Sequence, residues 1–312
     1  MTKIKIYIAS LLIAVLLATP NRLQAQGRRF AVLDLPGSAV SLAHGGSTFS
    51  YADGGNIYAN PSWNTECSMR ENVVSYSLGW IDQKSSKPTF HTLTAAHRQQ
   101  NSMIMLGARY YAQGTLNNLL DDNMQPVEGS IHMYSYTIDL GYAHKFHHFS
   151  IYTTLGLASE KTVTQTNSYR IGLGASYANH YKKATYQIGI GLRDLGIVST
   201  HNANKSLSPL IHAGGAIALQ VNQNHNIAVN VDGGLYPTVE YAKQTSTLAG
   251  GIDYQLYHHY TIRIGGHIGD DDNYLAPGLG LSFGKINVDG TIKLTLENDG
   301  VDYGMIGVNY NF

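Results

Sequence analysis

The chain has 312 residues, of which 13% are charged, against roughly 25% in an average soluble domain, and its 21 basic and 21 acidic side chains cancel. A chain of zero net charge has no global field that recruits nucleic acid, so its composition gives no support to nucleic-acid binding. The single cysteine, Cys67, excludes an intramolecular disulfide.

The N-terminus is typical of a secretory signal peptide. Lys3 and Lys5 precede a nearly unbroken apolar run over residues 6–18, and Ala25 offers a small residue before a cleavage site. An uncleaved membrane helix is the alternative, but the run is shorter than the roughly 20 residues that span a bilayer. We therefore expect a signal peptide over residues 1–25. No later apolar run has spanning length, so a mature protein that crosses a membrane must cross it as strands.

Residues 26–71 are rich in glycine and small side chains and do not read as a spanning strand. Residues 34–46 predict a short helix that ends at Gly45 and Gly46. Small residues on later strands, such as Gly156 and Gly189, would leave space for this segment inside a barrel, although they would equally ease strand curvature. We predict that residues 26–71 fold into the lumen as a plug, or hatch.

Residues 72–312 contain roughly fourteen segments of strand length, the spacing of a transmembrane β-barrel, with no room for another domain. Apolar and polar residues alternate most clearly in residues 186–193, 262–268 and 286–297. A period of two places the apolar set on one face for lipid and the polar set on the other for the lumen. Residues 302–312 alternate in the same way and end on Phe312, as the last strand of an outer-membrane barrel does.

Connections of two lengths alternate along these strands, which is typical of outer-membrane barrels with tight periplasmic turns and wide outside loops. Gly284–Lys285 and His147–His148 are short, whereas residues 112–129, 159–166 and 194–208 are expected to be wide. A soluble β-sandwich would not be expected to alternate short and long connections along the chain, and its outer faces would be polar and exposed to water. The pattern predicts an all-β, antiparallel barrel of about 14 strands in the bacterial outer membrane, with both barrel ends on the periplasmic side.

The sequence carries no catalytic signature. It lacks a Gly-x-Ser-x-Gly elbow, a His-Glu-x-x-His helix and a phosphate-binding Gly-x-x-x-x-Gly-Lys loop. Inward polar residues such as Asp139, Arg193, Asp232 and Arg263 could in principle gather into a hydrolase site, but no nucleophile stands beside a base. We expect a non-enzymatic protein with no catalytic residues and no cofactor.

Two histidine pairs and one acidic run raise the question of metal binding. His147–His148 and His258–His259 lie in expected short turns, where we interpret them as polar interface residues. Asp270, Asp271 and Asp272 lie in an expected outside loop and lack the spaced ligands and closing Glu of an EF-hand. A solvated loop is the simpler interpretation, so we predict no metal site, and ion binding by the acidic run stays open.

The N-terminal pattern resembles the PorV/PorQ family of outer-membrane proteins, whose barrels are similar to FadL, the long-chain fatty acid transporter. The family usually shows an Ala-rich stretch, Gly-Gly, an acidic-small pair and Asn-Pro-Ala. The matching residues here are Ala43, Gly45, Gly46, Asp53, Asn60 and Pro61. Ser62 stands where the family usually has Ala, and residues 139–146 look like the family's fourth-strand region. The resemblance implies a fourteen-stranded barrel with its N-terminal segment inside.

The resemblance also implies a role in type IX secretion, in which such barrels bind the C-terminal signal domain of exported proteins and pass them to attachment partners. The expected partners are secreted client proteins, other type IX components and outer-membrane lipid. A candidate partner-binding loop over residues 111–131 has unusual apolar content. Its apolar residues are Leu116, Leu119, Leu120, Met124 and Val127, which could alternatively cover the lumen.

The alternative function is FadL-like transport of a hydrophobic small molecule across the outer membrane. Transport of this kind needs an apolar pocket inside the barrel and a kink or opening in its wall, whereas client binding needs only exposed loops with apolar patches. A general diffusion porin is disfavoured, because a porin needs an open, charged channel and this lumen is expected to be small-residue and plugged.

Overall fold

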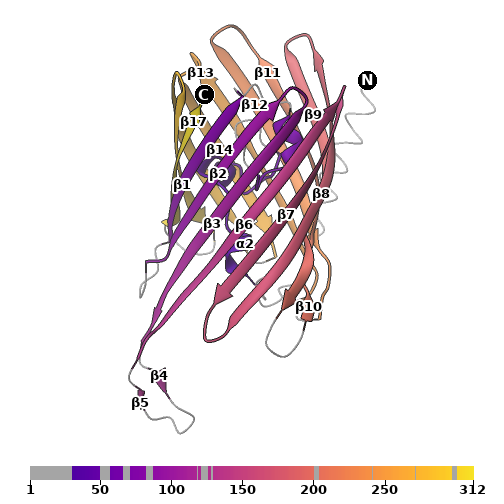
Figure 1. Ribbon diagram of the computed structural model, residues 1–312. Coiled ribbons are helices and arrows are strands. Elements are labelled where there is room, and N and C mark those ends of the chain that lie inside the picture. The colour runs from indigo at the N-terminus through magenta and orange to yellow at the C-terminus, as the bar shows by residue number, and fades with distance from the viewer. Residues whose placement is uncertain are drawn as a thin grey trace.

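The computed structural model describes residues 30–49, 57–65, 71–81, 87–117, 119–120, 126–127, 129–199, 204–240, 242–270, 272–296 and 301–312. Its main feature is an antiparallel sheet that closes on itself (Figure 1), because the first strand pairs with the last and β8 pairs with β9. The wall strands are β1 (Asn72–Ile81), β2 (Thr89–Gln99), β3 (Ser102–Leu116), β6 (Ile131–Phe146), β7 (Phe149–Lys161), β8 (Gln165–Tyr181), β9 (Ala184–Ser199), β11 (Leu210–Gln220), β12 (His225–Tyr236), β13 (Thr245–Leu256), β14 (Tyr260–Gly269), β15 (Tyr274–Phe283), β16 (Ile286–Thr295) and β17 (Val301–Asn311). These strands confirm the predicted fourteen-stranded antiparallel barrel.

Side chains alternate between the lumen and the outer surface along each wall strand. In β14, Thr261 and Arg263 are buried, whereas Ile262 and Ile264 are 52% and 53% exposed. Exposed apolar side chains recur in the same way around the barrel and form a lipid-facing belt. The chain is therefore an outer-membrane barrel, as its sequence pattern predicted.

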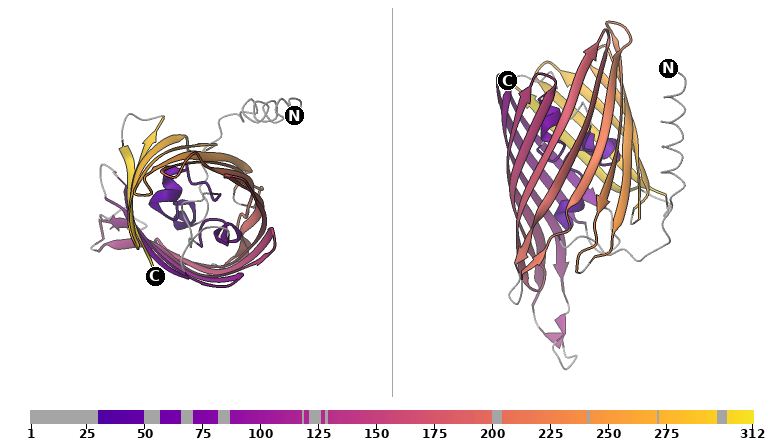
Figure 2. Two further views of the ribbon diagram at one scale, coloured as in Figure 1. Left: turned by 90° about the horizontal axis from the view of Figure 1, so that it is seen from above. Right: turned by 90° about the vertical axis from the view of Figure 1, so that its right-hand side faces the viewer.

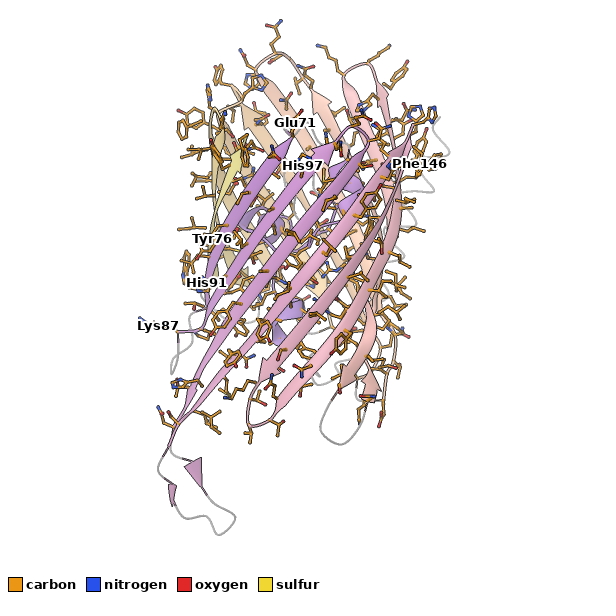
Figure 3. The ribbon with its side chains drawn as sticks, in the orientation of Figure 1. Glu71, Tyr76, Lys87, His91, His97 and Phe146 are labelled. Atoms are coloured by element: carbon orange, nitrogen blue, oxygen red, sulfur yellow. The ribbon has the colours of Figure 1, made fainter. Side chains whose placement is uncertain are left out.

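Aromatic side chains form a row on the outer face of four neighbouring strands. Tyr76 and His91 project from the outer face (Figure 3), and the Tyr76 hydroxyl lies 2.8 Å from His91 Nδ1. Tyr110 and Tyr134 continue the row, with ring centres 6.3 Å from His91 to Tyr110 and 6.1 Å from Tyr110 to Tyr134. Amphipathic rings in such a row suit a membrane interface.

The barrel has one end with tight turns and one end with wider connections. Tyr257–His259 and Gly284–Lys285 connect strands at the upper end in Figure 1, where the C-terminus also lies. Residues 237–244 connect β12 and β13 at the lower end. By the rule for outer-membrane barrels, the upper end is periplasmic and the lower end faces outward.

Two of the expected wide connections are wrong in extent. Strands β7 and β8 continue to Lys161 and from Gln165, so only residues 162–164 connect them. Strand β9 continues through Asp194 to Ser199 and pairs with an added short strand, β10 (Asn204–Ser206). In residues 159–166 polar side chains end the apolar pattern although the backbone still pairs. In β9 pairing resumes after the bulge at Asp194, and Leu195 and Ile197 stay on the outer face.

The described N-terminal residues lie inside the barrel (Figure 2), and we refer to residues 30–49 and 57–65 as the inner segment. The inner segment contains α2 (Ala31–Asp34), α3 (Ala39–Ala43) and α4 (Pro61–Asn64). Among the described residues, no helix is long and apolar enough to cross a membrane. The Ser38 hydroxyl accepts a hydrogen bond from the Ser41 backbone and so caps the start of α3.

Apolar packing fixes the inner segment against the wall. Phe30, Leu33 and Leu42 belong to a buried cluster that also includes Phe90 and Met305 of the wall. Burial of a side chain of this size contributes roughly 1.5–3 kcal/mol. A second contact joins the two described parts of the inner segment, because the Phe49 and Trp63 rings lie 5.1 Å apart, edge to face.

Candidate functional site

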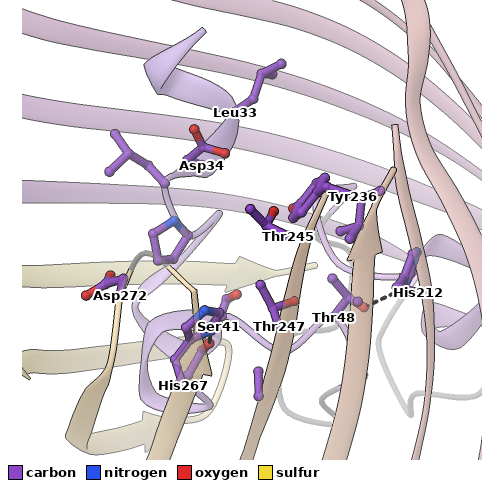
Figure 4. A pocket seen from close by; sticks show the side chains of 18 of the residues that line it. Leu33, Asp34, Ser41, Thr48, His212, Tyr236, Thr245, Thr247, His267 and Asp272 are labelled. Atoms are coloured by element: carbon purple, nitrogen blue, oxygen red, sulfur yellow. Dashed lines mark hydrogen bonds between the residues drawn. The ribbon is translucent and has the colours of Figure 1, made fainter. Parts of the chain in front are cut away.

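A cavity of about 410 Å³ lies inside the barrel between the inner segment and the wall (Figure 4). Its volume falls in the range of roughly 300–1,000 Å³ that is typical of small-molecule sites. Apolar and aromatic residues form part of the lining, namely Leu33, Leu35, Leu42, Tyr58, Leu210, Tyr236, Tyr274 and Tyr303. Charged residues form another part, namely Asp34, Arg109, Arg193, Asp232, Lys243, Asp270, Asp272 and Lys293. We refer to this space as the lumen cavity.

A group of stacked and ion-paired side chains from the wall lines one side of the lumen cavity. The His267 and Tyr274 rings stack with centres 5.2 Å apart and planes at 7°. The Lys293 ammonium lies 4.5 Å from the centre of the Tyr274 ring and is ion-paired with Asp272. His267 Nδ1 donates a hydrogen bond to the Gly45 carbonyl at 2.9 Å, which attaches this group to the inner segment. The lysine charge is thus compensated by a carboxylate and by a ring face.

Thr48 anchors the inner segment on the opposite side of the lumen cavity. Its backbone N–H and its hydroxyl donate to one carboxylate oxygen of Asp232 at 3.0 and 2.9 Å. The Thr48 hydroxyl oxygen then accepts from His212 Nδ1 at 3.1 Å, the contact drawn in Figure 4. All three side chains are buried, so the contacts satisfy polar groups that would otherwise be costly in the lumen.

A network of buried charges lies beside Tyr58 in the lumen. The Arg170 guanidinium donates to Asp139 at 2.6 Å and to Asp194 at 2.5 Å. The Tyr58 hydroxyl donates to the other oxygen of Asp139 at 3.0 Å, and the Arg109 guanidinium carbon lies 4.0 Å from the Tyr58 ring centre. Burial, and then the charge of Asp139, raises the pKa of Tyr58, so its phenol stays protonated and donates.

A second network holds the end of α3 against strands β13, β14 and β16. His44 Nε2 lies 2.7 Å from Asp253, and Arg263 forms ion pairs with Asp253 at 3.3 Å and Asp289 at 2.6 Å. Asn309 donates to the second oxygen of Asp289 at 3.2 Å. Each buried charge therefore has an opposite partner, which burial in the lumen requires.

Within the described residues, the barrel ladder is interrupted at four places, of which two, between β3 and β6 and between β16 and β17, lie near strand ends. The other two lie further inside their strands. Between β8 and β9 the register shifts near Gly172, and Asp194 adopts a φ of 58° at this bulge. Between β15 and β16 the pairing has a gap at Ala276–Pro277, where proline has no N–H to donate. These interruptions are positions at which the wall departs from regular pairing.

Close backbone approach also holds the inner segment in place. A Cβ atom added at Gly265 would lie 2.3 Å from the Ala43 carbonyl oxygen and 2.7 Å from the His44 Cα. A Cβ atom added at Gly290 of β16 would meet nothing within 4 Å. Gly265 therefore permits a contact between α3 and the wall that no other residue type permits.

We expect Gly265→Ala to displace α3 from the wall, because neither the Ala43 carbonyl nor the His44 backbone can move cheaply. Chymotrypsin treatment of the folded protein should then cleave the inner segment, for example after Phe49, at least about tenfold faster than in the parent chain. Gly290→Ala is the matched control and should leave the cleavage rate unchanged. Equal rates in both variants would contradict the role given to Gly265.

The residues of the N-terminal motif lie along the inner segment. Gly45 and Gly46 follow α3 with φ values of 68° and 79°, and an added Cβ at Gly45 would overlap the Gly266 carbonyl. Asn60 caps α4, where its side-chain oxygen accepts from the Ser62 N–H at 3.1 Å, and Pro61 is the first helical residue. Asp53 lies outside the described residues.

The candidate partner-binding loop lies apart from these motif residues. Leu116 ends β3 and is 44% exposed. Leu119–Leu120 (β4) pairs with Pro126–Val127 (β5) in a hairpin below the lower end of the barrel in Figure 1. Met124 lies outside the described residues. The structure therefore places the loop at the outward-facing end and not over the lumen cavity.

Four inward polar residues noted in the sequence do not form one site. Asp139 and Arg193 lie near Tyr58, Asp232 holds Thr48, and Arg263 belongs to the network of His44. The partners Thr48, Tyr58 and His44 were not predicted, since no periodic signal in the inner segment indicates which wall strand each residue meets.

The acidic run is engaged by protein groups in its described part. Asp270 accepts a hydrogen bond from the Ser246 backbone N–H at 2.8 Å, and Asp272 pairs with Lys293. Among the described residues, no three His, Cys, Asp or Glu side chains gather as a metal site would require.

Comparison with known proteins shows the fold and little sequence similarity. No protein-family model and no curated protein match the sequence. The crystal structure of the Pseudomonas putida toluene transporter TodX matches with a TM-score of 0.57 and 11% identity, over 89% of this chain and 97% of that chain. The CymD monoaromatic hydrocarbon channel matches with a TM-score of 0.58 and 13% identity, over 91% of this chain and 99% of that chain. The chain thus shares the barrel fold of TodX and CymD, and these matches do not support the finer PorV or PorQ resemblance.

Proposed function

We propose that the protein carries a hydrophobic small molecule across the outer membrane. The observation that carries this proposal is a lumen cavity, partly lined by leucine and tyrosine side chains, inside a barrel of the TodX and CymD fold. Two barrels of similar fold are described as a toluene transporter and as a monoaromatic hydrocarbon channel. By analogy of fold, a monoaromatic hydrocarbon is the first substrate to test.

In this proposal the inner segment is a plug, and the lumen cavity between the plug and the wall is the binding site. Buried apolar contacts and two charge networks hold the plug against the wall. A plug held in this way keeps ions and sugars out, while a hydrophobic ligand enters the cavity from the outward-facing end. The interruptions near Gly172 and at Ala276–Pro277 are candidate exits, because regular backbone pairing is missing there.

Type IX secretion is the second candidate function. The N-terminal motif implies it, and the projecting β4–β5 hairpin, which carries apolar residues of the predicted partner-binding loop, favours it. A secreted client protein would bind this hairpin from outside, without use of the lumen cavity. The structural matches favour transport, so client binding ranks second.

Filling the lumen cavity should abolish transport. Ala249 of β13 lines the cavity, so Ala249→Trp places an indole in the path of the ligand. We expect the uptake of radiolabelled toluene by intact Gram-negative cells that express the variant to fall at least about tenfold relative to the parent chain.

Ile252 of the same strand points outward and is 47% exposed, so Ile252→Trp is the matched control and should retain uptake. Folding of both variants is checked by the heat-dependent mobility of the barrel in gels. If cells with the parent chain take up no more toluene than cells with an empty vector, the transport proposal fails for this substrate.

A further inference from the structure

A second, smaller cavity adjoins the lumen cavity, between residues 57–61 of the inner segment and the wall. Its volume is about 30 Å³, and roughly 10–15 Å³ suffices for one particle of the size of a water molecule. Tyr58, Arg109 and Arg193 line both spaces. The charged groups among its described lining residues are three guanidiniums and two carboxylates, those of Arg109, Arg170, Arg193, Asp139 and Asp194. We refer to this space as the arginine cavity.

Both carboxylates of the arginine cavity are engaged by protein donors. One oxygen of Asp139 accepts from Arg170, and the other accepts from the Tyr58 hydroxyl. One oxygen of Asp194 also accepts from Arg170, and its other oxygen lies 4.0 Å from Arg193. Among the described side chains of this cavity, three positive charges therefore face two negative ones, so one positive charge is left over.

Arg109 carries this excess charge. It is 3% exposed, and among the described residues no carboxylate forms an ion pair with it. Its Nε donates to Thr137 at 3.3 Å and its guanidinium lies over the Tyr58 ring, so within the described part of the chain its terminal nitrogens have no hydrogen-bond acceptor. The charges of Arg170 and Arg193 lie close enough to repel it. A buried cation in this position requires a negative partner.

Asp232 does not supply that partner. It lines the lumen cavity and not the arginine cavity. One of its oxygens accepts two hydrogen bonds from Thr48, and among the described residues it forms no ion pair with an arginine.

A second donor without an acceptor faces the arginine cavity. Tyr152 of β7 is 4% exposed and lines the cavity, and its hydroxyl has no hydrogen-bond partner among the described residues. The charge of Arg193 acts on this hydroxyl. A buried hydroxyl without a partner is costly, and an anion would accept hydrogen bonds from the hydroxyl and from guanidinium groups alike.

We propose that the arginine cavity binds a small monovalent anion of the size of chloride, held by Arg109, Arg193 and the Tyr152 hydroxyl. The anion balances the third guanidinium and accepts from the donors that the protein leaves unused. The cavity is far below the roughly 300 Å³ at which sites for organic ligands begin, so the anion is a free ion. It links β3, β7 and β9 to residues 57–61 and so stabilises the plug, whatever the barrel transports.

The direct test is a crystal structure of the full barrel grown in sodium bromide, because bromide replaces chloride and scatters anomalously. We expect a bromide peak in the arginine cavity, within hydrogen-bonding distance of Arg109 and Tyr152. An arginine cavity without a bromide peak would overturn the proposal.

Unfolding in lipid vesicles tests the same site in solution. In about 100 mM sodium chloride the unfolding equilibrium constant should be at least about tenfold smaller than in equimolar sodium gluconate, whose anion is too large for the cavity. Arg109→Met should remove this difference, because it removes the excess charge. Lys205→Met is the matched control, since it removes an exposed cation that pairs with Glu240, and it should retain the difference.

Tyr152→Phe keeps every charge and tests the hydrogen bond. It should raise the chloride concentration needed for half of the stabilisation at least about threefold. Equal unfolding of the parent chain in the two salts would contradict the proposal, as would a chloride dependence that Arg109→Met and Lys205→Met change equally. Stabilisation that follows the sodium concentration and not the anion would also overturn it, because it would indicate a cation bound by Asp139 and Asp194.

Discussion

Deletion of residues 30–65 is expected to convert a barrel that barely conducts ions into an open pore, with single-channel conductance at least about tenfold higher. The inner segment buries Phe30, Leu42 and Trp63 completely inside the barrel. Without it, the inward polar side chains and glycines of the wall would face water, as in a porin. Planar-bilayer recording of the purified variant measures the change.

The control for this deletion removes residues 117–130, which include the β4–β5 hairpin, and joins β3 to β6 by a short linker. That hairpin lies outside the barrel in Figure 1, so its loss should leave conductance low. Both variants must first show the heat-dependent gel mobility of a folded barrel. A deleted inner segment with unchanged conductance would contradict its role as a plug.

Arg170→Met is expected to cost about 3 to 5 kcal/mol of unfolding free energy, because it removes the cation that two buried carboxylates share. Of the described cations, Asp194 then keeps only Arg193, whose nearest nitrogen lies 4.0 Å away. The side chains of Arg170, Asp139 and Asp194 are only 6%, 8% and 6% exposed. Urea unfolding of the barrel reconstituted in lipid vesicles measures the change through tryptophan fluorescence.

Lys205→Met is the matched control for this change. It breaks the ion pair of Lys205 with Glu240, whose side chain is 69% exposed, and should cost less than about 1 kcal/mol. If both variants unfold at the same urea concentration as the parent chain, the buried network does not contribute to stability in the way proposed.

The barrel was predictable from sequence because the signals for it are local. The alternation in residues 262–268 sets the inward and outward faces of β14 without reference to any other strand. The extents of the 159–166 and 194–208 connections were not predictable in the same way. Polar side chains hide the pairing of residues 159–166, and the bulge at Asp194 interrupts the alternation of β9 before pairing resumes. Only the neighbouring strand determines where pairing stops.

The contacts of the inner segment were not predictable because they depend on the tilt and register of the closed wall. His44 meets Asp253 across 209 residues of sequence, and Thr48 meets Asp232 across 184. The inward position of Asp232 follows from the alternation of side chains along β12, but the identity of its partner in the inner segment does not. A non-repeating segment inside a barrel carries no period that indicates which strand it faces.

The most direct test of the central claim, that a hydrophobic ligand occupies the lumen cavity, is a crystal structure of the barrel soaked with bromobenzene. We predict an anomalous bromine peak between the inner segment and the wall, near Leu42, Tyr236 and Tyr274, which line the cavity. Bromine peaks confined to the lipid-facing belt, with none in the lumen cavity, would contradict the account.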